Sequence, residues 1–402
     1  MLRRVAVTGL GVVTPIGNDL ESFLKNLKGG NSGEGEITRF EPERYPFRRA
    51  FEVKGFNPHA YRVHILDPFL QYAIAATSHA IHSAGLDLSS IDPFRIGISV
   101  SSSKGGVDAI ERLGERFSHH KSALLAARIY TSIVPNFAAQ WVARRWKIQG
   151  PAKCYVAACA TGTVAILEGV RMVREGIVDY CIAGASDASI VPLMLAGYYN
   201  MKAMARGAMR PFDRRRDGFL VGEGAGIVLL ESVESARARR AKIYGEVLGG
   251  AYGSDGTDLF NFSDRDGVLA YTLKQCLERS GLDSEAVDHI NLHGTATRKG
   301  DIYETNQIKE VFGKRSYKIP MCSVKSMTGH MLGASGAVEV IAALLSMEHA
   351  FIPPTIGLEK PDPQCDLNYT ANRFQEAKPR TALSISMGFG GHIAVIAMKK
   401  YD

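Results

Sequence analysis

Residues 157–170 read AACATGTVAILEGV, and this stretch decides the fold class that the sequence predicts. Its small residues favour a tight turn, and the apolar residues that follow predict a buried helix leading toward a strand. The same order of features returns at 328–344, TGHMLGASGAVEVIAAL. We therefore expect two similar halves, each with a small-residue turn that feeds the N-terminus of a buried helix.

Strand-like and helix-like patterns alternate along the rest of the chain, which predicts an α/β protein. The predicted strands span 4–8, 96–100, 180–184, 226–231, 244–250, 289–293, 382–387 and 393–398. The predicted helices span 68–84, 160–175, 266–280, 301–312 and 333–348. The polar, Arg-rich stretch 234–242 is the best candidate junction, so we predict an N-terminal domain over 1–240 and a C-terminal domain over 241–402.

The composition is that of a large globular protein: 402 residues, 46% hydrophobic and 22% charged. A chain of this length buries roughly three quarters of the surface that it exposes when unfolded, so it needs no disulfides or structural metal. A disordered tail, a disulfide scaffold and a small binding module are therefore excluded. The net charge of +7 favours acidic partners. The sequence contains no ribbon of alternating basic and aromatic residues, which would indicate nucleic-acid binding. We therefore expect no nucleic-acid partner.

The cysteines and the N-terminus bear on where the protein works. Six cysteines are spread through the chain, mostly beside apolar residues, as is typical of reduced thiols in a cytosol. The first residues, MLRRVAVTGLGVVTPIG, fit a strand entering a glycine turn better than a signal peptide, because their apolar stretch is short. No apolar run approaches the ~18 residues of a membrane-spanning helix. We expect a cytoplasmic protein without a membrane partner.

Cys159 is the first candidate for chemistry, because it lies among small residues directly before a predicted helix. Free N–H groups and the dipole at a helix N-terminus favour a thiolate of lowered pKa, and the same groups stabilise an oxyanion. The local residues also fit an inert, buried cysteine. Cys154 lies nearby, but no second pair stands at zinc-site spacing, so no metal site is predicted.

Two histidines lie at similar corners of the predicted fold. His293 ends a predicted strand in NLHGTAT, and His330 precedes a predicted helix in KSMTGH. Either one alone fits a structural histidine. Together with Cys159, they form a constellation of one nucleophile and two candidate acid–base groups.

Charged residues surround these motifs. Glu339 falls on the apolar face of its predicted helix, where it needs a partner, and Lys325 is a candidate. Asp301 and Glu304 could act as working carboxylates. Their D-x-x-E spacing instead favours a helix start, where both would accept N-terminal amides.

A glycine-rich string, GFGGH at 388–392, separates two predicted C-terminal strands. Its glycines allow close approach of the backbone and a mobile hinge. A plain hairpin turn fits the same residues.

In combination, these motifs become specific. They are AACATGT around Cys159, NLHGTAT around His293 followed by GDIYE, KSMTGH ending at His330, RPFDRRRDGFLVGEGAG at 210–226, and GFGG near the C-terminus. The sequence resembles a β-ketoacyl-[acyl-carrier-protein] synthase of the elongating, two-histidine (Cys-His-His) type in the thiolase superfamily. The resemblance covers nearly the whole chain.

The resemblance implies a fold and a reaction. The fold is thiolase-like, with two similar α/β halves in five alternating layers of helices and sheets, assembled as a homodimer or a heterodimer with a related subunit. The reaction is a decarboxylative Claisen condensation of an acyl group on Cys159 with malonyl on acyl carrier protein (ACP), which gives 3-oxoacyl-ACP and CO₂. No cofactor of the protein's own is implied, because phosphopantetheine on the acidic, transiently docked ACP carries the substrates.

The resemblance also implies individual roles. Cys159 carries the acyl group, and His293 and His330 hold the malonyl thioester and assist loss of CO₂. Lys325 and Glu339 orient the histidines. The backbone amides of Cys159 and Phe389 form the oxyanion hole, and the Phe389 side chain acts as a gate. Thr295 and Thr297 bind the phosphopantetheine arm.

Several positions depart from the family pattern. Lys104 stands where the family has an aliphatic residue bordering the acyl pocket, so a shorter pocket or a more polar chain is expected. Met387 and His392 are unusual in the gate string. These changes favour a specialised, polyketide-like or polyene-like pathway over housekeeping fatty-acid elongation.

Two questions stay open at this level. Basic residues at 214–216 and at 237–242 are candidates for the ACP-docking face, with a solvated surface as the alternative. The chain could also be the chain-length-determining partner subunit of a heterodimer, although such partners typically lack the nucleophilic cysteine. A degradative thiolase is disfavoured, because no second cysteine lies near the C-terminal glycines.

Overall fold

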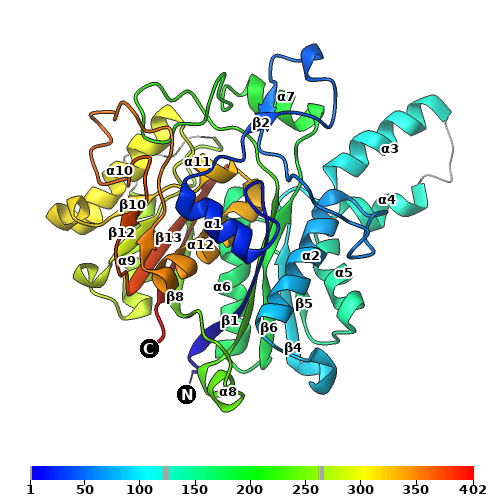
Figure 1. Ribbon diagram of the computed structural model, residues 1–402, viewed down its shortest axis with the longest axis horizontal. Helices are drawn as coiled ribbons and strands as arrows, with labels where there is room; N and C mark the ends of the chain where they lie inside the picture. The colour runs from blue at the N-terminus through cyan, green and yellow to red at the C-terminus, as the bar shows by residue number, and fades with distance from the viewer. Residues whose placement is uncertain (1, 121–125, 261, 263–266) are drawn as a thin grey trace.

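The computed structural model describes residues 2–120, 126–260, 262 and 267–402 (Figure 1). Within these residues, ten strands form one hydrogen-bonded sheet. They are β1 (Val5–Val13), β4 (Ile96–Ser101), β5 (Ala152–Lys153), β6 (Tyr180–Asp187), β7 (Gly224–Ser232), β8 (Gly245–Ser254), β9 (His289–Asn291), β10 (Met321–Cys322), β13 (Thr381–Gly388) and β14 (His392–Lys399). Two short pairs lie apart, β2 (Gly35–Glu36) with β3 (Arg49–Ala50) and β11 (Phe351–Ile352) with β12 (Gln375–Glu376).

The sheet consists of two halves with the same strand order. The N-terminal half runs β5-β4-β6-β7-β1, and the C-terminal half runs β10-β9-β13-β14-β8. In each half the first three strands are parallel, and the remaining pairings are antiparallel. The halves meet through a short antiparallel pairing of β1 with β8, from Val5↔Val247 to Val7↔Gly245. The internal repeat expected from the sequence is therefore a repeat of strand order.

Helices fill the other layers. The N-terminal half holds α1 (Leu20–Gly29), α2 (Pro68–Ser83), α3 (Val107–His120), α4 (Ala126–Ile133), α5 (Phe137–Trp146), α6 (Thr161–Arg174), α7 (Pro192–Asn200) and α8 (Val233–Ala238). The C-terminal half holds α9 (Val268–Ser280), α10 (Arg298–Phe312), α11 (Lys325–Thr328) and α12 (Ser335–His349).

These helices and the sheet form five layers (Figure 1). Helices α2 and α5 pack on the outer face of the N-terminal half-sheet, and α9 and α10 cover the outer face of the C-terminal half-sheet. Helices α6 and α12 lie between the two half-sheets, in a core that draws residues from both halves. The predicted thiolase-like architecture is confirmed, and each predicted strand and helix has a counterpart within a few residues. The domain boundary at residue 240 stays a prediction.

The two central helices meet through glycines. A Cβ on Gly162 of α6 would lie 2.7 Å from the backbone nitrogen of Ala337, and a Cβ on Gly336 of α12 would lie 3.0 Å from the backbone nitrogen of Thr163 in α6. Only glycine allows such close approach. Because both helices begin next to the candidate catalytic residues, this contact brings the chemistry of the two halves together.

In the part of the chain that the structure describes, no helix has the length and apolar character needed to cross a bilayer.

Candidate active site

Cys159 lies in a tight turn between β5 and α6. The turn is a short 3₁₀ helix, Ala158–Ala160, in which Ala158 has a φ of 47°, a left-handed conformation that is uncommon for a residue with a side chain. A Cβ on Gly388 would lie 2.8 Å from the Cys159 backbone nitrogen. The small residues on both sides therefore let the end of β13 reach the nucleophile, and the backbone amide of Phe389 is hydrogen-bonded to the thiol.

His330 contacts the Cys159 thiol directly. Its Nε2 lies 3.0 Å from Sγ of Cys159, and its Nδ1 lies 3.2 Å from the hydroxyl of Ser335, the first residue of α12. The Phe219 ring packs edge-on against the imidazole at 5.0 Å between ring centres. A hydroxyl both donates and accepts, so Ser335 accommodates either tautomer of His330.

His293 completes the predicted constellation. Its ring lies at 87° to that of His330, with ring centres 5.5 Å apart. Its backbone N–H donates to Glu304 at 2.6 Å, and the N–H of Gly294 donates to the other Glu304 oxygen at 2.9 Å. Glu304 therefore fixes the turn that carries His293.

The carboxylates of Asp301 and Glu304 correct one prediction. Helix α10 starts at Arg298, before both residues, and neither carboxylate caps it. Glu304 binds the His293 turn, and Asp301 accepts from the Phe212 N–H at 2.7 Å. The D-x-x-E spacing therefore gave a wrong prediction of helix capping, because both side chains are buried and accept hydrogen bonds from amides of other segments.

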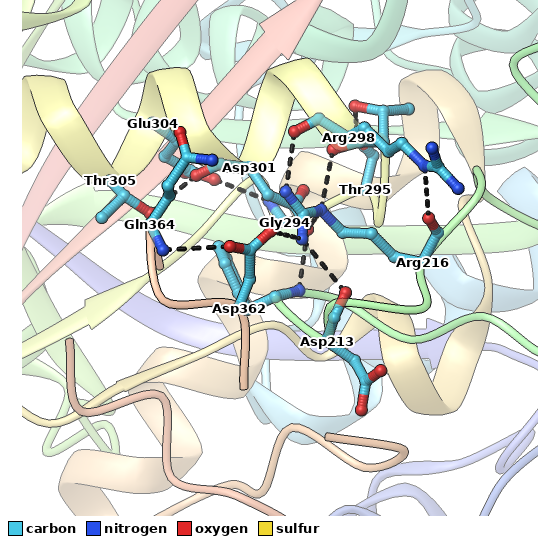
Figure 2. A network of polar contacts seen from close by, with 12 residues as sticks. Asp213, Arg216, Gly294, Thr295, Arg298, Asp301, Glu304, Thr305, Asp362 and Gln364 are labelled. Carbon is cyan, nitrogen blue, oxygen red and sulfur yellow. Dashed lines mark hydrogen bonds and ion pairs between the residues drawn. The ribbon is translucent and has the colours of Figure 1, made fainter. Parts of the chain in front are cut away.

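Asp301 belongs to a buried network around Arg216 (Figure 2). The Arg216 side chain is only 1% exposed; its Nε lies 3.3 Å from Asp301, and another guanidinium nitrogen donates to Asp362 at 2.6 Å. It also donates to the backbone carbonyls of Thr297 and Arg298 at the start of α10. The prediction that Arg216 contributes to a docking face is therefore wrong; Arg216 anchors the segment that follows His293.

Lys325 and Glu339 form a buried ion pair, as proposed from the sequence, and each side chain is 1% exposed. Both charges of the pair are therefore shielded from bulk solvent. Burial, assisted by that charge, holds the pKa of both His293 and His330 well below the usual range. Both imidazoles are therefore neutral at pH 7.

The thiol itself corrects a second prediction. Burial raises the pKa of Cys159 to about 11, although the charges of Lys104 and Lys325 oppose this change. The lowered pKa expected for a helix N-terminus is therefore not found, because desolvation of the sulfur outweighs these charges. The thiol needs a partner that takes its proton, and His330 is in contact.

One cavity of about 1060 Å³ joins these groups. Cys159, His293 and His330 line it, together with Thr295, Thr297 and Phe389. The two threonine hydroxyls lie 3.2 Å apart. Phe389 packs edge-on against Phe260 at 5.9 Å between ring centres. Lys104 is not among the residues described as lining this cavity.

The mouth of the cavity carries cations that the sequence analysis missed. Lys202 and Arg206 follow α7, and Arg298 and Lys299 open α10; all four are exposed and line the cavity. Within the described residues, none of them forms an ion pair. Because almost a hundred residues separate the two pairs in sequence, composition could not show this cluster; the position of Arg298 and Lys299 just after the His293 motif was the available signal.

The other predicted basic cluster lies elsewhere. Residues 237–242 comprise the end of α8 and the residues after it, at the opposite end of the molecule from α7, which precedes the cavity residues (Figure 1). In that cluster, Arg239 pairs with Glu231, and Lys242 pairs with Glu348. This position does not suit a docking face for the cavity.

Known proteins share both the sequence and the fold. Residues 2–236 match the Beta-ketoacyl synthase N-terminal domain, and residues 244–359 match the Beta-ketoacyl synthase C-terminal domain. The 3-oxoacyl-[acyl-carrier-protein] synthase 2 of Synechocystis sp. is 37% identical over 410 residues, which cover 100% of this chain and 99% of the relative.

Two solved structures extend the comparison. The ishigamide ketosynthase/chain length factor superposes with a TM-score of 0.94 at 33% identity, covering 100% of both chains. A type II polyketide ketosynthase, solved in complex with its acyl-carrier protein and bound to the hexaketide, gives a TM-score of 0.94 at 32% identity over 100% of both chains. The resemblance drawn from the motifs is confirmed: this chain belongs to the β-ketoacyl synthase family, with the thiolase-like fold of its condensing enzymes.

Proposed function

We propose that the protein is a 3-oxoacyl-ACP synthase that condenses an acyl group on Cys159 with malonyl-ACP. The observation that carries the proposal is the contact of 3.0 Å between Sγ of Cys159 and Nε2 of His330, with His293 beside them in one cavity. A thiol, a base in contact with it and a second neutral imidazole are the groups that acyl transfer followed by decarboxylation requires.

The first step transfers the acyl group. The Cys159 sulfur attacks the thioester carbonyl of acyl-ACP while its proton moves to Nε2 of His330. The backbone amides of Cys159 and Phe389 stabilise the oxyanion; loss of one such donor typically costs about 10²–10³ in rate. The tetrahedral intermediate expels the phosphopantetheine thiolate, which takes the proton from His330, so His330 returns to its neutral form.

The second step makes the carbon nucleophile. Neutral His293 and His330 each donate one N–H to the thioester carbonyl of malonyl-ACP. The bond from the carboxylate carbon to the α-carbon breaks, CO₂ leaves, and its electron pair forms an enolate held by the two N–H groups. The enolate carbon then attacks the acyl-Cys159 carbonyl, and the Cys159 thiolate leaves, giving 3-oxoacyl-ACP. A proton from solvent restores the Cys159 thiol for the next cycle. These donors already stabilise the enolate, so we propose no metal or cofactor bound to this chain.

Thr295 and Thr297 support binding of the phosphopantetheine arm, because both residues line the cavity and their hydroxyls lie 3.2 Å apart. Phe389 supports a gating role, since it both lines the cavity and supplies an amide to the thiol. The fatty-acid and the specialised polyketide-like or polyene-like pathways share this chemistry.

We propose that ACP docks on the cationic mouth formed by Lys202, Arg206, Arg298 and Lys299. An acidic carrier is drawn to unpaired cations, and the phosphopantetheine phosphate would meet them at the cavity entrance. Changing Arg206 to Glu should raise the KM for malonyl-ACP about tenfold with little change in kcat, because a rim charge acts mainly on association. Steady-state kinetics at low salt measures this.

The control for this prediction is Arg240→Glu, which makes the same charge change at an exposed residue outside the cavity mouth. This variant should keep the wild-type KM. Equal KM values for the two variants would contradict the proposal that ACP docks at the cavity mouth.

We propose a dimer formed through the N-terminal half-sheet. β5 is an edge strand that pairs only with β4 in the described chain, and Val156, just beyond it, is 58% exposed. Edge strands with apolar neighbours invite pairing with another copy. A second copy of this chain and a related subunit are both compatible with this edge.

The alternative role, a non-catalytic chain-length partner, has less support because Cys159 is present beside His330. The free cysteines suit the cytoplasm, where we place the reaction.

The test is a condensation assay with acyl-ACP and malonyl-ACP. The protein should release CO₂ and form 3-oxoacyl-ACP in equal amounts, with an acyl adduct on Cys159 detected by mass spectrometry when malonyl-ACP is withheld. An unmodified Cys159 after incubation with a panel of acyl-ACP chain lengths would overturn the proposal.

A further inference from the structure

The mechanism leaves one charge near the nucleophile without a role. Acyl transfer needs a thiolate at the moment of attack, yet burial disfavours a negative sulfur. In many thiolate sites a protonated histidine supplies the opposite charge. His330 does this poorly, because burial and neighbouring lysines keep it neutral. His330 accepts the thiol proton, but its protonated form is disfavoured, so a further positive charge near the sulfur would favour the thiolate during attack.

Two lysines act on the Cys159 sulfur, Lys104 and Lys325. Lys325 is committed to Glu339, since both side chains are 1% exposed and form an ion pair. The Glu339 carboxylate offsets part of the Lys325 charge at the sulfur. Lys104 forms no ion pair within the described residues, and its side chain is half-buried. Of these two lysines, Lys104 is therefore the one without an ion-pair partner among the described residues.

The loop that carries Lys104 is held rigidly. Asp187, at the end of β6, is fully buried and accepts hydrogen bonds from the Ser102 and Ser103 hydroxyls and from the backbone N–H of Ser103. The N–H of Gly333 donates to the same carboxylate at 2.7 Å. This one carboxylate therefore ties the Lys104 loop to the turn that follows His330.

Close packing places the loop beside the nucleophile's helix. A Cβ on Gly333 would lie 2.8 Å from Cβ of Ser103, and a Cβ on Gly162 would lie 2.8 Å from the Gly333 carbonyl oxygen. Ser103, Gly333 and the first turn of α6 are thus stacked in contact. Lys104 follows Ser103, and Cys159 precedes α6, so the two residues emerge from one packed corner.

The other charged or titratable groups near the sulfur do not replace this charge. Asp187 acts against a thiolate, and burial raises its own pKa, although the serine hydroxyls oppose that change. Tyr198 is buried near the sulfur, and burial raises the pKa of its phenol, so it is neutral at working pH. His330 is the proton acceptor. Lys104 and Lys325 are the cations that favour a negative sulfur, and of these Lys104 has no ion-pair partner among the described residues.

We propose that Lys104 is the counter-charge of the Cys159 thiolate, a positioning residue that acts through the sulfur during acyl loading. This inference deepens the proposed function and rests on it for the acyl donor. It gives Lys104 a role different from the one expected from sequence, in which it bordered the acyl pocket. It also explains how a site with two neutral imidazoles generates a thiolate without a stable imidazolium.

Alkylation of the thiol by iodoacetamide tests the proposal without ACP. The sulfur displaces iodide, so the rate follows the thiolate population, and mass spectrometry of the Cys159 peptide reports it from pH 6.5 to 10. Removing a nearby positive charge raises the thiol pKa and moves the rate profile to higher pH. In Lys104→Met the rate at pH 8 should fall about three- to tenfold, while Lys104→Arg should keep the wild-type profile.

Lys378→Met is the matched control, because it removes an exposed lysine that does not line the cavity, and it should leave the alkylation profile unchanged. Lys104→Gln provides a second neutral variant if Lys104→Met unfolds, with thermal unfolding as the check. A wild-type profile in the neutral variants overturns the inference, as does an equal loss in Lys104→Arg. Because no carrier protein is involved, failure of the condensation assay and failure of this inference are separate outcomes.

Discussion

Replacing Cys159 with alanine should lower the rate of 3-oxoacyl-ACP formation by at least about 10³-fold, because the acyl group then has no atom to bind covalently. The substitution removes only a sulfur from a turn that already consists of small residues, so the fold should persist. The measurement is product formation from acyl-ACP and malonyl-ACP, together with the mass of the intact protein after exposure to acyl-ACP.

The same variant should still decarboxylate malonyl-ACP. Loss of CO₂ needs the donors of His293 and His330. Glu304 still holds the backbone of His293, and Ser335 still contacts the His330 ring, when the sulfur is removed. Uncoupled release of CO₂ without condensation product would therefore separate the two half-reactions. Acetyl-ACP should accumulate in place of 3-oxoacyl-ACP.

Cys154→Ala is the matched control for this prediction. Cys154 is half-buried in the segment just before the nucleophile, but it does not line the cavity as described. Its loss should leave condensation near the wild-type rate. Condensation by Cys159→Ala at the wild-type rate would contradict the assignment of the nucleophile, and inactivity of Cys154→Ala would show that the assay reports general damage to this segment.

Much of the site could be predicted because its residues lie where short sequence patterns change. Cys159, His293 and His330 each lie at the end of an element and among small residues, and these features are visible locally. A partner for Glu339 could also be predicted, because burying an unpaired carboxylate on an apolar helix face costs free energy. The repeat of strand order followed from two similar turn-and-helix motifs.

The errors share one physical cause, which is burial produced by distant segments. Arg216 is one of three successive arginines, and nothing local distinguishes it from its exposed neighbour Arg214. Asp301 and Glu304 have the spacing of a helix start, yet the fold delivers amides from other segments to them. The direction of the Cys159 pKa depends on desolvation, which no local pattern encodes. Helices α3 and α5 were also not predicted.

The buried pair of Lys325 and Glu339 gives the second prediction. Changing Lys325 to Met leaves the Glu339 carboxylate buried without its counter-charge, which should cost about 3–5 kcal/mol of unfolding free energy. Chemical denaturation measures the loss. Activity should also fall, because the histidines lose the positive charge that helps to keep them neutral.

A double variant separates these two effects. Lys325→Met with Glu339→Leu replaces the ion pair by apolar groups of similar size, a change that is often neutral for stability. Stability should therefore return toward wild type, while condensation stays impaired and the decline of decarboxylation at acidic pH moves upward. The sign follows from charge: without Lys325, protonation of His293 and His330 meets less opposition, so their pKa values rise and each ring loses its neutral form at a higher pH. A double variant that recovers both stability and the wild-type pH profile would show that the pair stabilises the fold but does not affect the histidines.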